Sequence, residues 1–490
     1  MAKCIMLQGT MSNVGKSLLT AALCRIFTQD GYKTAPFKSQ NMALNSFITK
    51  EGLEIGRAQA MQAEAAGIEP LAAMNPVLLK PTTDTGSQVI VMGEVRGNMS
   101  AREYFKHKKQ LIPTIKAAYD SLAEKNDIIV IEGAGSPAEI NLKADDIVNM
   151  GIAKLVNAPV LLIGDIDRGG VFAQLLGTAD LLEADEKQLL KGLIINKFRG
   201  DKSLLDSGVE ILEKRSGKPV LGVIPYIHAD IDDEDSLSER FDRHREGVID
   251  IAVIRLPHIS NFTDFAALEC IEGAGLRYVS RADELGTPDM VILPGTKNTL
   301  SDMRFLRESG FEVKIKRLAA ADTPIFGICG GFQLLGNEIS DPYNTEGGGT
   351  MQGLGLLPVK TVFSKQKTRT RVKGVFKNVQ GIFSGLNGIE TEGYEIHQGQ
   401  TDGNMLLLEN GIMDGLSVGN ICGTYIHGIF DTSAAANAVV SALAAKKGIN
   451  ADFCAVDMRE YKNRQYDILA DAVRRNIDIK KIYEITEKGV

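Results

Sequence analysis

Several features that would tie a chain to a metal, a membrane or nucleic acid are missing from this sequence. The six cysteines lie far apart and form no C-x-x-C pair. This spacing argues against a structural metal and against a disulfide framework, and it is typical of a reducing compartment. The sequence contains no basic block, acidic tail, apolar leader or hydrophobic run of membrane-spanning length. We therefore expect no nucleic-acid partner, no membrane partner and a cytoplasmic location.

What is present is the composition of a soluble globular protein. Hydrophobic residues make up 44% of the 490 residues, charged residues make up 24%, and the net charge is −7. These proportions are ordinary for folded domains in water. A chain of this length exceeds one hydrophobic core, so we expect two or three domains. Nothing in the sequence indicates an internal repeat or determines the oligomeric state.

The first half of the chain alternates short apolar runs with helical periods. The runs "KCIMLQG", "DIIVIEG", "PVLLIGD", "GLIINKF" and "PVLGVIP" are apolar on both faces, which is typical of parallel strands covered by helices on both sides. We predict a doubly wound α/β domain over residues 1–227 and a polar, acidic linker at 228–247. A second α/β domain begins with "VIDIAVIRLP" and covers 248–437, and an amphipathic helical tail covers 438–490.

The stretch "GTMSNVGKS" follows the first predicted strand and opens the first predicted helix. Glycines, a helix N-terminus and a lysine together provide the groups that bind phosphate oxygens. Five residues separate its first glycine from Gly-Lys-Ser, one more than in the standard phosphate-binding loop. We predict a nucleotide site of the phosphate-loop type here, with a serine hydroxyl directed at Mg²⁺. Its residues are Gly9, Thr10, Asn13, Val14, Gly15, Lys16 and Ser17.

Carboxylates end two further predicted strands of the same domain. Glu132 ends "DIIVIE" and is followed by small residues, so it is placed to bind Mg²⁺ at the carboxyl edge of the sheet. Asp165 and Asp167 in "LLIGDIDRGG" occupy an equivalent position. These two aspartates could hold magnesium, orient a substrate or cap the next helix, and the sequence favours none of the three.

A second candidate site surrounds Cys329 in "TPIFGICGGFQLLG", which we predict to be a strand, a sharp turn and a helix. Glycines on both sides of the cysteine permit the strained turn that exposes a nucleophile, and the following helix stabilises a thiolate. Backbone N–H groups of Gly330 and of Gly295, in "LPGTKN", are candidates to stabilise an oxyanion. The predicted base is His427 at the end of "CGTYIH", with His258 and His397 as alternatives.

Longer segments carry a resemblance to known families. The loop "GTMSNVGKS" is similar to that of the dethiobiotin synthetases, and the second domain resembles the class I glutamine amidotransferases. With "PFKSQNMALNS", "EIGRAQAMQAEAAG", "DIDRGGVFAQL", "RLPHISNFTDF" and "GTYIHGIFD", the chain resembles the cobyric acid synthase family up to about residue 435.

That resemblance implies a carbon–nitrogen ligase of cobalamin biosynthesis with ATP, Mg²⁺, glutamine and a corrinoid as ligands. The b, d, e and g carboxylates of adenosylcobyrinic acid a,c-diamide would be activated as carboxyl phosphates and amidated to give adenosylcobyric acid. The alternative is cobyrinic acid a,c-diamide synthase or a related amidotransferase. The segment "FKSQNMALNS" speaks against this sister enzyme, which has an aspartate-rich stretch there.

The resemblance also assigns roles to single residues. Asn196 in "IINKFRGD" matches the position that reads adenine in the relatives. Ile429 stands where class I amidotransferases carry the glutamate that orients the catalytic histidine, so that partner is unassigned, with Glu395 and Asp431 as candidates. Because the implied substrate is polyanionic, we expect cations from suitable loops to bind it, in no particular order: Lys38, Arg57, Arg168 and Arg199.

Overall fold

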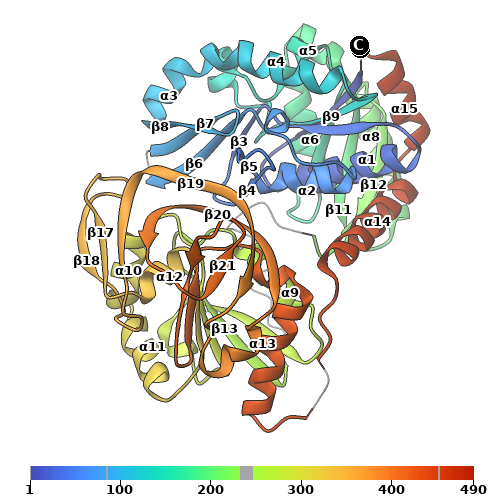
Figure 1. Cartoon of the computed structure of the whole chain (residues 1–490). Coiled ribbons are helices and arrows are strands. Elements are labelled where there is room, and N and C mark those ends of the chain that lie inside the picture. The colour runs from blue at the N-terminus through green and yellow to red at the C-terminus, as the bar shows by residue number, and fades with distance from the viewer. Residues whose placement is uncertain (1, 84–85, 232–246, 451–452) are drawn as a thin grey trace. The chain divides into compact units, whose positions relative to one another are not determined.

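The computed structural model describes residues 2–83, 86–231, 247–450 and 453–490, and it divides the chain into two compact units. The first unit consists of Met1–Ala43, Leu53–Glu234 and Lys462–Val490. The second consists of Leu44–Gly52 and Asp235–Tyr461. Each unit contains its own β-sheet with helices packed against it (Figure 1). None of the helices in these ranges has the length and hydropathy needed to cross a membrane.

The first unit is built on a six-stranded sheet with the order β12-β11-β10-β1-β9-β2. All its strand pairs are parallel. Successive strand residues are buried on opposite faces of the sheet, which is why the runs are apolar throughout. The predicted doubly wound α/β fold is confirmed. The strands are β1 (Lys3–Gly9), β2 (Thr34–Phe37), β9 (Ile128–Glu132), β10 (Val160–Asp165), β11 (Leu190–Phe198) and β12 (Val220–Pro225).

Helices cover both faces of this sheet. Residues of α1 pack on one face, and residues of α4, α5 and α6 pack on the other. A small sheet with the order β3-β6-β7-β8 completes the unit. The helices are α1 (Lys16–Gln29), α2 (Arg57–Ala65), α3 (Ala101–His107), α4 (Ile112–Ala123), α5 (Met150–Val156), α6 (Val171–Asp180), α7 (Ala184–Leu189) and α8 (Asp206–Ser216). The remaining strands are β3 (Gln40–Met42), β5 (Glu54–Gly56), β6 (Val77–Thr83), β7 (Gly86–Val91) and β8 (Glu94–Ser100).

The second unit contains a sheet with the order β14-β13-β15-β16-β24-β23, in which only β23 is antiparallel to its neighbour. Its strands are β13 (Ile249–Ile254), β14 (Ala274–Val279), β15 (Met290–Leu293), β16 (Ile325–Ile328), β23 (Leu416–Val418) and β24 (Ile421–Thr424). The helices of this unit are α9 (Ala266–Glu269), α10 (Thr299–Glu308), α11 (Phe311–Ala320), α12 (Gly330–Leu335) and α13 (Ser433–Lys446). A short 3₁₀ helix, η6 (Phe262–Phe265), precedes α9.

A second sheet of this unit has the order β18-β17-β19-β21-β22, with β20 paired to β19. Its strands are β17 (Glu338–Asp341), β18 (Gly349–Gln352), β19 (Lys360–Phe376), β20 (Glu390–Thr401), β21 (Leu406–Leu408) and β22 (Met413–Asp414). The short strand β4 (Ser46–Ile48) also belongs to this unit, although it comes early in the sequence.

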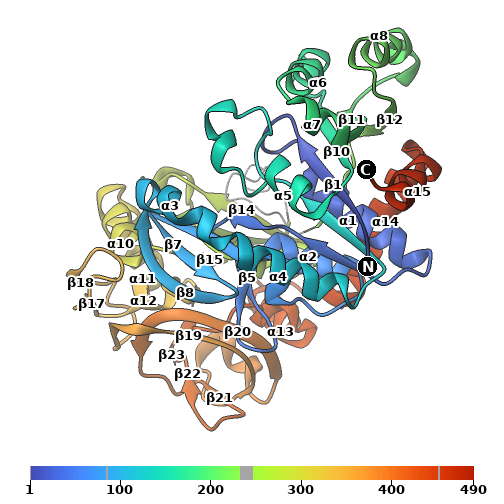
Figure 2. The same cartoon turned by 90° about the horizontal axis from the view of Figure 1, so that it is seen from above.

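The C-terminal region does not form the separate tail predicted at 438–490. The α13 helix begins at Ser433 and packs in the core of the second unit. The helices α14 (Met458–Asn476) and α15 (Ile479–Lys488) bring apolar residues into the same cluster as α1, where Tyr466 is buried and its Oη donates to Glu64 at 2.8 Å. Figure 2 shows both helices beside α1. Their apolar stripe thus completes the first unit's core. Of the predicted linker, residues 232–246 lie outside the described residues.

Candidate functional site

The loop between β1 and α1 has the backbone shape that a phosphate site requires. Asn13 and Gly15 have positive φ angles of 60° and 95°. A Cβ atom on Gly9 would lie 2.5 Å from Val14 and 2.9 Å from the Met11 carbonyl oxygen. The chain can therefore fold back this closely only over a glycine. Such a turn directs backbone N–H groups toward one point at the N-terminus of α1.

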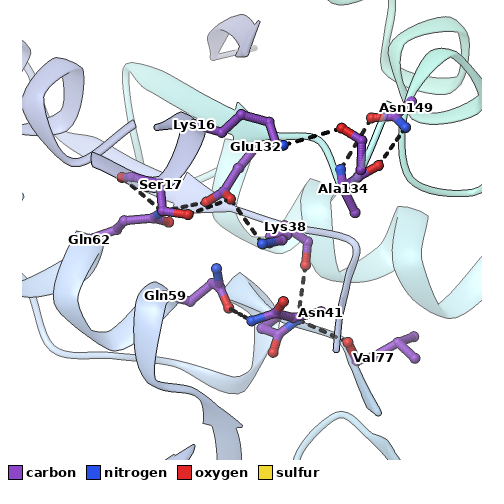
Figure 3. Close-up of polar contacts among 12 residues, drawn as sticks. Lys16, Ser17, Lys38, Asn41, Gln59, Gln62, Val77, Glu132, Ala134 and Asn149 are labelled. Carbon is purple, nitrogen blue, oxygen red and sulfur yellow. Dashed lines mark hydrogen bonds and ion pairs between the residues drawn. The ribbon is translucent and has the colours of Figure 1, made fainter. Parts of the chain in front are cut away.

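Lys16 and Ser17 begin α1 and direct their side chains to this edge of the sheet (Figure 3). The Lys16 ammonium donates to the carbonyl oxygens of Met11 at 3.0 Å and Gly135 at 3.2 Å. The Ser17 hydroxyl donates to Glu132 Oε1 at 2.8 Å. Because β1 and β9 are neighbours in register, Leu7 lies opposite Glu132, so the carboxylate ends its strand beside the loop. The structure thus brings these three predicted residues together.

Glu132 is buried among polar partners. Lys38 Nζ lies 2.9 Å from its Oε1, and Gln62 Nε2 donates to its Oε2 at 2.5 Å. Lys38, predicted as a contact to the corrinoid, is itself only 5% exposed. Burial and this ion pair hold the ammonium beside Glu132, and a contact of Lys38 to the corrinoid stays a prediction. The cation balances the buried carboxylate, which would otherwise be costly to ionise.

The turn after β9 is fixed by Asn149, which the sequence analysis did not identify. Its Oδ1 accepts from the Ala134 N–H at 3.1 Å, and its Nδ2 donates to the Ala134 carbonyl oxygen at 2.7 Å (Figure 3). A Cβ atom on Gly133 would lie 2.3 Å from the same amide. These two hydrogen bonds fix the backbone of Ala134, which precedes Gly135. The carbonyl oxygen of Gly135 accepts a hydrogen bond from Lys16.

Asn196 lies against the phosphate loop. Its Nδ2 donates to the Val14 carbonyl oxygen at 2.8 Å, and a Cβ atom on Gly15 would lie 2.3 Å from this amide. The side chain therefore supports the loop, and its role in reading adenine stays a prediction. Thr10 is tied to α6, because its Oγ1 donates to Gln174 Oε1 at 3.2 Å.

The acidic end of β10 is surrounded by cations. Asp165 accepts from the Asp167 N–H at 2.9 Å and lies 3.0 Å from Lys197 Nζ, so it closes the turn after β10. The helix that follows, α6, has Gly170 at its N-cap. Arg199 donates to Asp167 Oδ1 at 2.9 Å, and Arg168 lies 4.0 Å from Asp165. Both arginine side chains are more than half exposed, at 53% and 59%. Their contacts to a corrinoid stay predictions.

Arg57 differs from the exposed arginines. It is the first residue of α2, it is 7% exposed, and its Nη2 lies 3.4 Å from Glu64 Oε1. Arg57 therefore begins a helix and does not lie in a loop as expected, and its contact to a corrinoid stays a prediction. In the described ranges, no group of three or more His, Cys, Asp or Glu side chains could hold a metal ion.

In the second unit, Cys329 lies at the turn between β16 and α12 with φ 51° and ψ −106°. This is a left-handed conformation that costs energy in a residue with a side chain. The glycines around it are required sterically, since a Cβ atom on Gly331 would lie 1.9 Å from the Leu293 carbonyl oxygen. Cys329 is 7% exposed, and its thiol donates to the Ile396 carbonyl oxygen at 3.9 Å. The predicted strand, sharp turn and helix are observed, and the role of Cys329 as nucleophile stays a prediction.

His427 lies three residues beyond β24 and is almost fully buried. Its Nδ1 lies 2.7 Å from Asp264 Oδ2, and the other oxygen of that carboxylate accepts from the Gly428 N–H at 3.1 Å. Burial opposes a charge on the imidazole, but the Asp264 carboxylate and a hydrogen bond with the Cys329 thiol outweigh it. Together they raise the pKa of His427 to about 10. The resulting arrangement is a cysteine, a histidine and an orienting aspartate.

The orienting group is therefore neither Glu395 nor Asp431, the two candidates named from the sequence. Glu395 lies 3.6 Å from His397 Nε2, and Asp431 belongs to the turn after His427. Asp264 comes from η6, more than 160 positions earlier in the chain. The signal that could have found it is the segment "RLPHISNFTDF", whose only acidic residue is this aspartate.

The alternative histidines have other partners. His258 Nδ1 lies 2.7 Å from Asp302 Oδ1. His397 Nδ1 lies 2.7 Å from the Gly399 carbonyl oxygen, and its ring stacks on Tyr425 with 3.7 Å between centroids. The Cys329 side chain contributes to the raised pKa of His427.

The two glycines predicted to stabilise an oxyanion lie close to the elbow. A Cβ atom on Gly330 would lie 2.9 Å from the Thr296 nitrogen, and one on Gly295 would lie 3.1 Å from His427 Cε1. The loop after β15 therefore passes directly beside the turn that carries Cys329. Their roles as N–H donors stay predictions.

Comparison with known proteins agrees with both halves of this description. The CobQ/CobB/MinD/ParA nucleotide binding domain family matches residues 5–237. The CobB/CobQ-like glutamine amidotransferase domain family matches residues 250–435.

Curated relatives extend this similarity over the whole chain. Cobyric acid synthase of Ruminiclostridium cellulolyticum is 57% identical, covering 100% of this chain and 98% of the relative. That of Lachnoclostridium phytofermentans is 56% identical over 100% of both. That of Thermoanaerobacter sp. is 52% identical, covering 100% of this chain and 99% of the relative. At this identity and coverage, the chain belongs to the cobyric acid synthase family and is a glutamine-hydrolysing amidoligase.

Proposed function

We propose that this protein uses ATP and glutamine to convert adenosylcobyrinic acid a,c-diamide to adenosylcobyric acid. Four peripheral carboxylates, b, d, e and g, would each become an amide. The observation that carries the proposal is the pairing of two sites in one chain: a phosphate loop with Lys16, Ser17 and Glu132, and a Cys329–His427–Asp264 arrangement. The full-length similarity to cobyric acid synthases supports the corrinoid as substrate.

The first site would activate the carboxylate. A carboxylate resists attack by ammonia because it is anionic and has no good leaving group, whereas a carboxyl phosphate releases phosphate readily. The loop N–H groups and Lys16 would bind the phosphates of ATP and stabilise the charge that develops on the transferring phosphoryl group. Mg²⁺ fits this site, since Ser17 Oγ and Glu132 supply adjacent hard oxygen ligands, and it would shield the phosphate charge.

The second site would release ammonia from glutamine. Asp264 raises the pKa of His427 to about 10, which keeps the imidazole protonated at neutral pH, so that it would serve as the counter-ion of a Cys329 thiolate. The thiolate attacks the amide carbon, the oxyanion faces the N–H groups of Gly330 and Gly295, and His427 gives its proton to the departing nitrogen. Water then attacks the thioester while His427 takes a proton from it. The C–S bond breaks, glutamate leaves, and the thiolate and the protonated imidazole are restored.

The products of the two half-reactions combine to form the C–N bond of the new amide. Ammonia attacks the carboxyl phosphate carbon, a C–N bond forms, and phosphate leaves with the oxygen it received from the carboxylate. Each amide should therefore consume one ATP and one glutamine. At neutral pH free ammonia is mostly protonated and unreactive, so we expect sheltered transfer of ammonia from Cys329 to the acyl phosphate.

The test is a time course with purified protein, magnesium-ATP, glutamine and adenosylcobyrinic acid a,c-diamide. Mass spectrometry should show a ladder of products that carry successively more amides and ends at adenosylcobyric acid. One ATP site must accept several differently placed carboxylates, so partly amidated intermediates should be released into solution. A reaction that uses only cobyrinic acid and adds only the a and c amides would reassign the protein to the sister activity, cobyrinic acid a,c-diamide synthase.

A further inference from the structure

A short segment from the nucleotide-binding part of the sequence belongs to the unit that contains Cys329. Residues Leu44–Gly52 are part of the second unit, although Ala43 and Leu53 on either side belong to the first. The segment includes β4, which packs against β19 and β20. It lies outside residues 250–435, which match the amidotransferase domain family. The second unit therefore contains chain that this domain family does not include.

The beginning of the segment holds the residue that precedes η6. The Asn261 N–H donates to Asn45 Oδ1 at 2.8 Å, and the Ser46 N–H donates to Asn261 Oδ1 at 3.3 Å. Asn261 has a left-handed backbone with φ 52°, a conformation that its contacts must maintain. Its carbonyl oxygen accepts from the Asp264 N–H at 3.1 Å. The two asparagine contacts thus fix the short helix that presents Asp264 to His427.

The middle of the segment supports Tyr394, whose ring stacks on the face of His427. The Tyr394 ring stacks on the His427 ring, with 5.1 Å between centroids and 21° between planes. Tyr394 Oη donates to the Ser46 carbonyl oxygen at 3.4 Å, and the Phe47 ring lies 5.8 Å from the Tyr394 ring. Ile48 is fully buried in the same small apolar cluster as Tyr394. The segment therefore contacts Tyr394, which stacks on the histidine, and Asn261, which precedes the short helix that carries Asp264.

The segment is itself anchored to the second unit by Arg371 of β19. Arg371 Nε donates to the Ile48 carbonyl oxygen at 3.1 Å, and its guanidinium lies 4.8 Å from the Phe47 ring centroid. This anchor means that Leu44–Gly52 holds one defined position against β19 and β20.

We propose that Leu44–Gly52 is a positioning element of the glutaminase, which holds Asp264 and Tyr394 in place on two sides of His427. Asn45 is its principal positioning residue, because it is buried and accepts directly from Asn261. The inference rests on the proposed roles of Cys329 and His427. It makes glutamine hydrolysis dependent on a segment that is continuous in sequence with the nucleotide-binding domain.

The test compares variants of the full chain with two nitrogen sources. Asn45→Ala removes the acceptor for Asn261 and should lower glutamine-dependent amidation by about 10- to 100-fold, because small displacements of catalytic groups are costly. Ammonia-dependent amidation should stay near the native rate. Asn45→Asp keeps an acceptor oxygen and should recover most of the lost rate. Asn410→Ala, at an exposed turn in the same unit where Oδ1 accepts from the Ile412 N–H at 3.0 Å, is the matched control.

A second readout follows the nucleophile itself. Alkylation of Cys329 by iodoacetamide is measured against pH by mass spectrometry of its peptide, with the exposed Cys454 as internal reference. In Asn45→Ala, a displaced Asp264 supports the imidazolium less well, so half-maximal alkylation of Cys329 should move to higher pH while Cys454 is unchanged. In Asn45→Asp, alkylation of Cys329 should follow the same pH profile as in the native chain. If Asn45→Ala only destabilised the fold, the pH profile of alkylation would change for both cysteines or for neither.

The inference is overturned if Asn45→Ala keeps native glutamine-dependent rates, or if both nitrogen sources lose rate equally. It is also overturned if the Cys329 profile does not move. Cys329→Ala separates this inference from the proposed function. If that variant still amidates with glutamine, the assigned glutaminase site is wrong. If it loses glutamine use while Asn45→Ala behaves like the native chain, only the positioning inference fails.

Discussion

The two candidate sites of this molecule are built in different ways. The nucleotide site uses a contiguous loop, Gly9–Ser17, and one carboxylate from the neighbouring strand in the sheet, Glu132. The glutaminase site uses Cys329, His427 and Asp264, which lie far apart in the sequence, and it is bordered by a segment from the N-terminal region. A local site can be read from one motif, whereas a site made of distant residues depends on the fold that gathers them.

The largest effect is expected at the nucleophile. Cys329→Ala should abolish glutamine-dependent amidation, a loss on the order of 10⁴-fold or more, because the covalent step has no substitute. Ammonium salts at alkaline pH should still support synthesis, since the nucleotide site is intact. Rates with both nitrogen sources are compared in Cys329→Ala and in the exposed-site control Cys454→Ala. Equal failure with both sources in a folded protein would refute the division into two sites.

Asp264→Asn should lower the rate of glutamine-dependent amidation on the order of 10³-fold. The asparagine amide neither stabilises the imidazolium of His427 nor fixes the tautomer of its ring. Asp264 raises the pKa of His427, so its removal lowers that pKa and the imidazolium is lost at a lower pH. The thiolate, deprived of its cation, should form at higher pH, which moves Cys329 alkylation upward in pH. The exposed Asp402→Asn is the matched control. A native alkylation profile in Asp264→Asn would show that Asp264 does not control the histidine.

Lys16→Ala should lower the rate of synthesis on the order of 100-fold or more with glutamine and with ammonia alike. The substitution removes the positive charge that stabilises the transferring phosphoryl group. The measurement is ADP release together with amide formation, beside Lys33→Ala, which replaces an exposed lysine of the same unit. Near-native ammonia-dependent synthesis in Lys16→Ala would move the ATP site away from this loop.

Lys38→Met tests the buried pair with Glu132 and should have a smaller effect, about tenfold on both nitrogen sources. The carboxylate keeps Ser17 and Gln62 but loses the cation at 2.9 Å that holds it in place. Lys33→Met serves as the control. A change confined to the Michaelis constant for the corrinoid, with ATP parameters unchanged, would instead return Lys38 to the substrate-binding role predicted from the sequence.

The fold and the contiguous motifs could be predicted from the sequence because their signals are local. Apolar runs identify the parallel strands, and glycines around Cys329 mark a turn that only small neighbours allow. The orienting aspartate could not be found in this way, because no local pattern links η6 to the end of β24. The burial of Lys38 could not be predicted, since a basic residue in a loop-like segment carries no sign of burial. The C-terminal helices were read as a tail because their partner surface, α1, lies at the other end of the chain.

If the two sites cooperate to form each amide bond, the native chain should consume one ATP and one glutamine for each amide. This stoichiometry is the most direct test. ADP, glutamate and new corrinoid amides are counted in the same time course with adenosylcobyrinic acid a,c-diamide as substrate. We expect equal amounts of all three at every stage of the product ladder, because one carboxyl phosphate captures one ammonia. Amides that form without matching ADP, or in clear excess over glutamate when glutamine is the only nitrogen source, would contradict it.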